Sequence, residues 1–330
     1  MRAEARTRTE KTAKRSRHTR LLPRMSLRQR MKRGIPLYIM FAIPAVWYIL
    51  FRYLPMIGIS FAFMDFKPNK LFSSGWVGLQ HFADLMHDAD YWRVFINTLA
   101  LGGLNLLVNF PLPIVFAIML NEIRVKWFRR TAQTISYLPH FVSVVALANV
   151  LFLMLDTRDG IVNRIIVSLT GDPIYFKIES EWFRPLYIIF WAWKEMGWGT
   201  IIYLAAMASI DPQLYEAAKI DGASRMRRIW SITLPCIIPV IGIMLILNTP
   251  SIINADFETV LLFQNIDNIS TADVVATYIF RMTIKGIGNE AVRPQYSYAT
   301  AVGLFSSLLS LILVVISNYT SKKLGGVSVW

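Results

Sequence analysis

Two adjacent ionisable residues, Lys194 and Glu195, lie in the middle of a long apolar stretch of the sequence. Charged side chains are expensive inside a membrane segment, and those that occur there mark substrate pathways by default. Neighbours on a helix point about 100° apart, so the two side chains cannot share one partner, and at least one is expected to face a polar cavity. Trp191, Trp193 and Trp198 flank the pair. Aromatic faces with a few hydrogen-bonding groups suit a sugar ring, which has apolar faces and a hydroxyl rim.

The same residues have purely structural interpretations. The three tryptophans could form the aromatic belt that membrane proteins place at the lipid–water boundary. Lys194 and Glu195 could lie at the outer membrane boundary or in an interface between subunits. Residue types and spacing leave these alternatives open.

Enzymatic motifs are absent from the sequence. It contains no G-x-x-x-x-G-K-[ST], no H-E-x-x-H and no G-x-S-x-G, which are the patterns of phosphate-binding loops, zinc peptidases and serine hydrolases. The four histidines are far apart, and Cys236 lies in an apolar stretch with no charged neighbour to activate it. We therefore predict no catalytic residue, no metal site and no cofactor bound by this chain.

The composition excludes several classes of protein. Of the 330 residues, 55% are hydrophobic and only 17% are charged, against about 25% in soluble proteins. Mean hydropathy is +0.43. Such a low-charge chain with one cysteine is not a soluble globular enzyme, a disulfide-rich secreted scaffold or a collagen-like protein.

The positive charge is concentrated at the start of the chain. The formal net charge is +14, and residues 1–33 hold 13 of the 35 lysines and arginines against Glu4 and Glu10. A nucleic-acid-binding arm is one interpretation, but interleaved aromatics and a folded nucleic-acid module are lacking. We predict a basic N-terminal tail over residues 1–33 that touches anionic lipid, no nucleic-acid partner, and a transmembrane domain over residues 34–330.

Six stretches are long and apolar enough to cross a hydrocarbon core of roughly 30 Å as helices. We expect an all-α polytopic membrane protein with spans at about 35–63, 96–120, 135–155, 182–208, 232–253 and 298–319. Pro44 and Pro55 predict that the first span kinks or ends in two stages.

Lysine and arginine set the orientation of these spans. Four segments hold 23 of the 35 lysines and arginines. They are residues 1–33, the loop after span two, the loop after span four and the C-terminal segment after span six. These segments alternate along the chain, so all four lie on one side, which the positive-inside rule identifies as the cytoplasm. Both termini are therefore expected to be cytoplasmic.

The loop between spans four and five, residues 211–235, has the pattern of two short helices joined by a turn. Asp211 is a good N-cap, and Pro212 fits the first helical position. Alanines in the middle of the first helix give it a small, smooth face that can enter a cleft on another protein. Gly222 is expected to end that helix, because glycine adopts positive φ at low cost.

This loop resembles the EAA loop of bacterial ABC importer permeases, in the residues Glu216-Ala217-Ala218, Asp221-Gly222-Ala223, Ile232 and Leu234-Pro235. Further segments are similar to saccharide-importer permeases of the LplB type, akin to the maltose and alginate permeases, and the resemblance extends from about residue 35 to the end. These segments are Ser136–His140, Gly197–Ala206 and Gln295–Gly303. The resemblance implies a type I ABC importer permease fold in a bacterial plasma (inner) membrane.

It also implies partners and residue roles. In such permeases the EAA helix docks in a groove of an ATP-hydrolysing subunit, so two cytoplasmic ATPase subunits would hold ATP and magnesium. By this likeness Glu216 makes a polar contact, Ala217 and Ala218 allow close approach, Asp221 fixes the turn and Gly222 sets the bend. The alternative is that Glu216 and Asp221 are solvated charges on a loop helix.

The sugar path is placed by the same resemblance, since maltose-type permeases contact sugar through the helices before and after the EAA loop. The comparable residues here are Lys194, Glu195 and Trp198, then Asn248 and Ser251. Asn248 could instead hydrogen-bond a neighbouring helix. The other expected partners are a second, related permease, giving a heterodimer, and a solute-binding protein at the long outer loops.

The function that follows is transport of a saccharide by a subunit that is not itself an enzyme. Closure of the ATPase partners would push on residues 211–235 and switch the helix bundle between two states. The alternative is an intramembrane channel or enzyme that needs no ATPase. No filter-like or charged-ring segment of the kind channels use is visible in the sequence.

Overall fold

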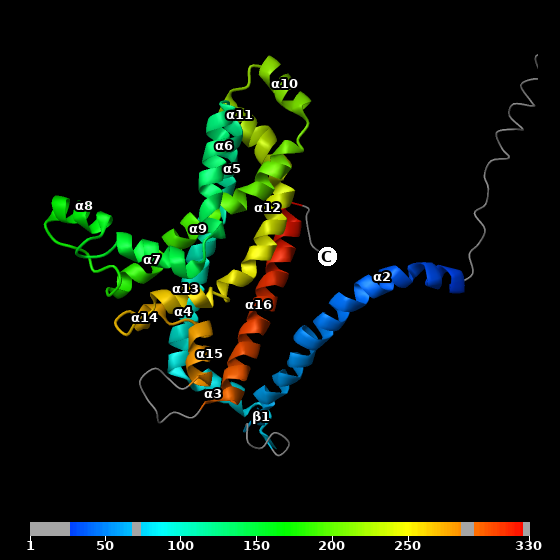
Figure 1. Cartoon of the computed structure of the whole chain (residues 1–330), viewed down its shortest axis with the longest axis vertical. Coiled ribbons are helices and arrows are strands. Elements are labelled where there is room, and N and C mark those ends of the chain that lie inside the picture. The colour runs from blue at the N-terminus through cyan, green and yellow to red at the C-terminus, as the bar shows by residue number, and fades with distance from the viewer. Residues whose placement is uncertain (1–26, 68–73, 285–293, 326–330) are drawn as a thin grey trace, which may run out of the picture. The chain divides into compact units, whose positions relative to one another are not determined.

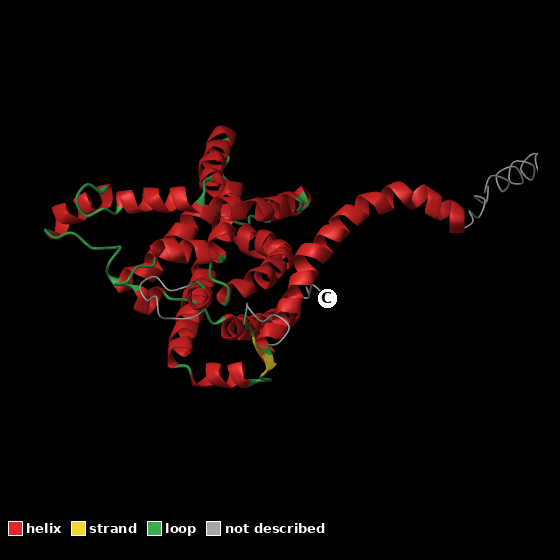
Figure 2. Cartoon of the chain, turned by 60° about the horizontal axis from the view of Figure 1, so that its bottom comes forward, coloured by secondary structure: helices red, strands yellow, loops and turns green. Residues whose placement is uncertain are grey.

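The computed structural model describes residues 27–67, 74–284 and 294–325. Within these ranges the chain is helical (Figure 2) except for loops and one antiparallel ribbon, in which β1 (Met64–Asp65) pairs with β2 (Gly75–Trp76). The predicted all-α class is confirmed. Most of the predicted tail lies outside the described residues, while residues 27–33 already belong to a helix. The chain divides into two compact units at Gly58–Ile59.

The first span is a continuous helix that changes its winding ahead of a proline. It runs through α2 (Leu27–Tyr48), the π-helical turn η2 (Ile49–Tyr53) and the 3₁₀ segment η3 (Leu54–Phe63). The amide of Leu54 bonds to the carbonyl of Ile49, five residues earlier. Pro55 has no amide hydrogen and would clash with the carbonyl four residues before it, so the wider π turn relieves that clash.

The fifth span uses the same device. It consists of α11 (Arg225–Arg228), the π-helical turn η7 (Ile229–Thr233), α12 (Leu234–Asn248) and the 3₁₀ segment η8 (Thr249–Ile252). The amide of Leu234, the residue before Pro235, bonds to the carbonyl of Ile229. Both π turns thus end two residues before a proline.

Spans two and six are long helices. The short helix α3 (Gln80–His87) precedes α4 (Ala89–Asn109) and α5 (Pro111–Glu122). These last two form one 34-residue apolar helix, because Phe110 donates its amide to Leu106 across the junction and Pro111 is tolerated at a first-turn position. The last span is α16 (Tyr296–Gly325). Four described helices are long and apolar enough to cross a membrane, and they match predicted spans one, two, five and six.

The third predicted span is broken rather than continuous. α6 (Lys126–Tyr137) and the 3₁₀ turn η5 (Leu138–Phe141) are followed by α7 (Val144–Met154), and the two halves meet at 107°. Pro139 lies in the turn, and the Ser143 hydroxyl accepts the amide of Ala146 to start α7 afresh. A proline followed by a new N-cap ends a helix, which an apolar run alone does not reveal.

The fourth span is α9 (Phe183–Ala208), whose 26 residues give a length of about 39 Å. It is long enough to cross, but Arg184, Lys194 and Glu195 make it less apolar than the four helices above. α9 is the central helix of the second unit and packs against α4, α5, α6 and α12. All six predicted spans are therefore helical, with the third bent.

Basic and acidic connections lie at opposite ends of the second unit. α10 (Pro212–Ile220) and α11 lie at the same end as the α5–α6 connection, whereas α3 and α15 (Val275–Thr283) lie at the other end and α8 (Ile161–Thr170) lies to one side (Figure 1). The outer elements include α8, α15, η6 (Ser180–Trp182), α13 (Phe257–Phe263) and α14 (Ile269–Ala272). This arrangement agrees with the alternation of loops predicted from charge.

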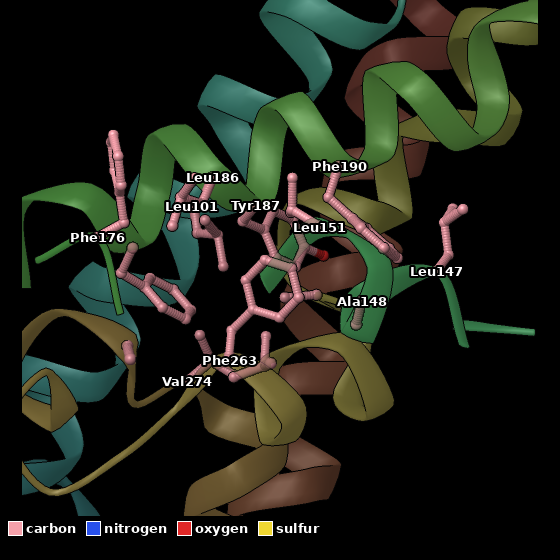
Figure 3. Close-up of a cluster of buried hydrophobic side chains, with 14 residues drawn as sticks. Leu101, Leu147, Ala148, Leu151, Phe176, Leu186, Tyr187, Phe190, Phe263 and Val274 are labelled. Atoms are coloured by element: carbon pink, nitrogen blue, oxygen red, sulfur yellow. The ribbon is translucent and has the colours of Figure 1, made fainter. Parts of the chain in front are cut away.

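A buried apolar cluster holds α9 against the outer helices (Figure 3). Leu186, Tyr187 and Phe190 of α9 meet Leu151 of α7 and Phe263 of α13. The rings of Phe190 and Phe263 pack edge to face with centroids 5.3 Å apart. Burial of such aromatic side chains stabilises the fold and fixes α9 beneath the outer elements.

Gly197 allows α9 to touch the end of α6, and replacing it is expected to destabilise the protein. A Cβ at this position would lie 2.0 Å from the carbonyl oxygen of Ser136, so the backbone must move. We expect Gly197→Ala to lower the free energy of unfolding by about 1–3 kcal/mol, measured by thermal unfolding in detergent. Gly103→Ala is the matched control, since nothing lies within 4 Å of that Cβ; equal losses in both variants would contradict the close approach.

Candidate functional site

The helix α10 is formed and closed by the residues that the sequence indicated. The Asp211 carboxylate accepts the amide of Gln213 at 2.9 Å, and Pro212 occupies the first helical position. Gly222 has φ of +74°, and the amide of Ala223 bonds to the carbonyl of Ala218 at 2.9 Å, the long bond of a glycine-terminated helix. The predicted short helix and glycine turn are confirmed.

α10 exposes its motif to solvent. The side chains of Glu216, Ala217 and Asp221 are exposed, and Ala218 is half-buried. Exposed apolar side chains surround them, including Ile220 at 87% and Trp230 at 64% of full exposure. Isolated exposed apolar residues are normal, but a group of them on one loop is typical of an interaction surface.

A side-chain bond links α10 to the fifth span. The hydroxyl of Tyr215 lies 2.9 Å from the hydroxyl of Thr233, which belongs to the π turn η7 and is buried. This bond and the short connection to α11 attach α10 to the beginning of the fifth span.

Lys194 is buried at the break of the third span. Its ammonium donates to the carbonyl of His140 at 2.9 Å and to that of Val142 at 3.4 Å, and only 7% of the residue is exposed. A broken helix leaves carbonyls that lipid cannot satisfy, and the lysine supplies the missing donor. Glu195 carries the balancing charge, 3.6 Å from that ammonium.

His140 and Trp198 complete this polar cluster. The Nδ1 of His140 lies 3.0 Å from both carboxylate oxygens of Glu195. The rings of His140 and Trp198 are stacked, with centroids 4.3 Å apart and planes within 2°. The cluster joins η5 to α9 and sets the orientation of the Trp198 ring.

A cavity of about 420 Å³ lies beside this cluster. Residues from α4, α5, α9, α12 and the segment after η8 line it. It contains Glu195, Trp198, Asn248 and Ser251, four of the five residues predicted for the substrate path. Lys194 is not among the lining residues, because its side chain is turned toward the carbonyls of the broken span.

Half of the remaining lining residues carry amides or aromatic rings. Those that the sequence reasoning did not single out include Asn105, Asn109, Tyr187 and Tyr203. Asn105 and Asn109 are one turn apart in an apolar helix, and such polar residues inside a span are a signal that could have found them. The Asn109 amide donates to Asn105 Oδ1 at 2.7 Å, while its own Oδ1 has no hydrogen-bond partner among the described residues.

Asn248 and Ser251 bond within their own segment. The amide nitrogen of Asn248 donates to the carbonyl of Met244 at 2.8 Å, and the hydroxyl of Ser251 donates to the carbonyl of Asn248 at 2.6 Å. The side-chain nitrogen of Asn248 therefore bonds within its own helix and not to a neighbouring helix, which was the alternative expected from the sequence. Of the three tryptophans, Trp191 and Trp198 line the cavity and Trp193 is exposed.

A carboxylate at the outer end of span two ties three helices together. Asp88 is the N-cap of α4 and accepts the hydroxyls of Tyr278 at 2.6 Å and Tyr298 at 2.7 Å. Burial alone would raise the pKa of Asp88, but these two bonds and those from the amides of Tyr91 and Asp90 lower that pKa below its ordinary value. The carboxylate thus stays ionised and holds α4, α15 and α16 together.

A second buried carboxylate holds the outer segment to α4. Asp273 is fully buried and lies 2.7 Å from the guanidinium of Arg281 and 3.7 Å from that of Arg93. The Asn97 amide donates to the carbonyls of Ser270 and Asp273. The outer elements therefore pack on one another and on α4 through satisfied charges.

Among the described residues, no group of three or more histidine, cysteine, aspartate and glutamate side chains is placed to hold a metal ion. The predictions of no metal site and no catalytic group in this chain remain predictions.

Known proteins are similar to this chain in both sequence and fold. Residues 109–326 match the family described as "binding-protein-dependent transport system inner membrane component". The polygalacturonan/rhamnogalacturonan transport system permease protein YteP of Bacillus subtilis (strain 168) is 43% identical over 290 residues, which is 88% of each chain. Protein LplB of the same organism is 42% identical over 294 residues, 89% of this chain and 90% of that one.

Solved structures agree with these relatives. The chain is similar, with a TM-score of 0.82 and 39% identity, to a chain of a bacterial ABC transporter involved in the import of the acidic polysaccharide alginate, covering 91% of this chain and 99% of that one. It matches equally well a chain of the bacterial alginate ABC transporter in complex with an alginate pentasaccharide-bound periplasmic protein, covering 92% and 100%. Fold, span pattern and sequence agree, so this multi-pass membrane protein belongs to the family of binding-protein-dependent transport system inner membrane components and is a transport subunit.

Proposed function

We propose that this chain is one of two membrane-spanning subunits of an ATP-driven importer of saccharides in a bacterial plasma (inner) membrane. The observation that carries the proposal is α10, a capped and exposed helix at the end of the molecule where the basic loops lie. The family supports import dependent on a binding protein, and the names of the relatives support a saccharide as cargo.

In this proposal α10 is the contact with an ATPase subunit. Glu216 presents its carboxylate to a partner, and the small side chains Ala217 and Ala218 let the helix enter a groove. Asp221 and Gly222 keep the turn that orients it. ATP and magnesium are bound by two partner subunits, and their closure moves α10, which is tied to the fifth span by the Tyr215–Thr233 bond.

The cavity beside α9 is the proposed saccharide path. Trp198 and Trp191 offer aromatic faces to a sugar ring, while Glu195, Asn248 and Ser251 offer hydrogen-bonding groups around it. Lys194 acts behind the cavity wall, where it holds the broken third span and balances the charge of Glu195.

Three further partners belong to the proposal. The outer helices, held in place by Asp88 and Asp273, form a firm surface for a solute-binding protein, which the complex with a periplasmic protein in a similar structure supports. The second permease is expected to be a related chain that completes the path as a heterodimer. Anionic lipid is expected beside the basic residues 1–33.

The test is ATP-dependent uptake by the purified assembly. Proteoliposomes with this chain, its partner permease, the ATPase subunits and the binding protein should take up oligosaccharide only when ATP is supplied. The chain should also copurify with an ATPase. Flux or chemistry by the isolated chain without ATP would instead support the alternative of a channel or enzyme.

A further inference from the structure

We infer that the cavity beside α9 holds an uncharged sugar unit rather than a uronate. The inference rests on the proposed function and narrows its substrate class. It starts from the charges of the cavity wall: the charged side chains among the described lining residues are Glu195 and Asp256, both acidic, and no lysine or arginine is among them.

The basic group nearest to the wall is already engaged. Lys194 directs its ammonium to the carbonyls of His140 and Val142 at 2.9 and 3.4 Å. It also lies 3.6 Å from the Glu195 carboxylate, whose charge it balances. With 7% of its surface exposed, the lysine cannot turn toward a bound carboxylate without leaving two carbonyls of the broken span unsatisfied.

The carboxylate of Asp256 has a structural role. Its Oδ2 accepts the amide and the hydroxyl of Thr259 at 2.8 and 2.7 Å and so caps α13. The partial positive charge at the N-terminus of a helix favours a carboxylate at this position. A uronate carboxylate in the cavity would meet the carboxylates of Asp256 and Glu195, whose own partners are already engaged, and no lysine or arginine of this chain is among the described lining residues.

The neutral groups of the wall suit sugar hydroxyls. Asn105, Asn109, Asn248 and Tyr187 line the cavity, and amides and hydroxyls both donate and accept hydrogen bonds. Carboxylates accept hydrogen bonds from hydroxyl donors, which a neutral sugar provides on every side.

The names of two relatives refer to polymers that contain acidic sugars, so the inference concerns the unit held in this cavity, whatever the charge elsewhere on the cargo. In a low-dielectric site like charges repel strongly. Removing the charge of the sugar carboxylate should therefore improve binding, and removing the charge of Glu195 should cancel part of that gain.

The experiment measures binding of trigalacturonate and of its trimethyl ester to the complete importer in nanodiscs, by quenching of tryptophan fluorescence. The two probes differ in charge at nearly the same shape. We expect the ester to bind at least fivefold more tightly in the wild type. Glu195→Gln should reduce the preference to twofold or less, and Asp256→Asn should reduce it independently. Glu258→Gln, an exposed carboxylate elsewhere in α13, should leave the preference unchanged.

Equal or tighter binding of the free acid, no binding of either probe, or a preference that neither variant changes would overturn the inference. The proposed function is judged separately by ATP-dependent uptake. An importer that carries a saccharide but prefers the acid loses only the charge assignment, whereas an assembly that carries no saccharide with ATP loses both.

Discussion

Replacing Lys194 with methionine is expected to abolish transport and to destabilise the assembled protein. The substitution keeps most of the apolar stem of the side chain but removes the donor to the carbonyls of His140 and Val142, and it leaves Glu195 without its lysine partner. Removing one partner of a fully buried ion pair costs about 3–5 kcal/mol, and the loss expected here is smaller because 33% of the Glu195 side chain is exposed. The third span should lose its fixed bend, and with it the orientation of the Trp198 ring. Uptake in proteoliposomes and thermal unfolding in detergent measure the two effects.

Two further variants separate this effect from a general loss of positive charge. Lys323→Met removes an exposed lysine near the end of α16 and should change neither measurement. In Lys194→Met combined with Glu195→Gln, the unpaired carboxylate is gone, so part of the stability should return because only the carbonyls remain unsatisfied. A Lys194→Met protein with wild-type melting and transport would show that the break needs no ammonium.

Reversing the charge of Glu216 is expected to separate ATP hydrolysis from transport. Glu216 is exposed on α10, so Glu216→Lys should leave folding and membrane insertion intact. If the carboxylate makes a polar contact in a partner groove, its replacement by an ammonium places like against like and costs about 2–5 kcal/mol, a fall in uptake of about 30-fold or more. Uptake and ATPase activity are measured on the same preparation.

Graded variants make the assignment sharper. Glu216→Gln keeps the shape of the side chain and should lose less than Glu216→Lys. Asp84→Lys reverses an exposed charge on α3, at the far end of the same unit (Figure 1), and should behave as wild type in ATPase coupling. Unchanged uptake in Glu216→Lys would show that this residue makes no essential contact with the ATPase subunit. A variant that fails to insert into the membrane would show that Glu216 is needed for folding.

The helix α10 could be predicted in detail because its signals are local. An aspartate N-cap, a proline at the first position and a glycine with positive φ act within a few residues of one another, and the structure has each of them in place. Apolar length likewise predicted six helical spans. The break in the third span was missed because Pro139 and Ser143 stop a helix only when another helix satisfies the carbonyls set free.

The cavity likewise combines residues that the sequence indicated with residues that only the tertiary structure brings together. Residue types indicated Lys194 and Glu195 as a polar pair in a span, and resemblance placed Asn248 and Ser251 across from them. Only the tertiary structure turns Lys194 away from the cavity and brings Asn105 and Asn109 of span two into its wall. These positions depend on how α4, α9 and α12 pack, which no single stretch of sequence contains.

The sequence by itself thus determined the class of protein, the positions of the helical stretches and the form of the loop at residues 211–235, and it predicted the orientation of the spans. Each of these follows from the hydrophobic effect acting on a run of residues or from hydrogen bonds within one turn. Tertiary structure decided which charges face the cavity, where the third span bends and which residues hold the outer helices. Those features arise from contacts between residues 50 to 200 or so positions apart, such as Lys194 with His140 and Tyr298 with Asp88, whose energies depend on close packing and on satisfying every buried polar group.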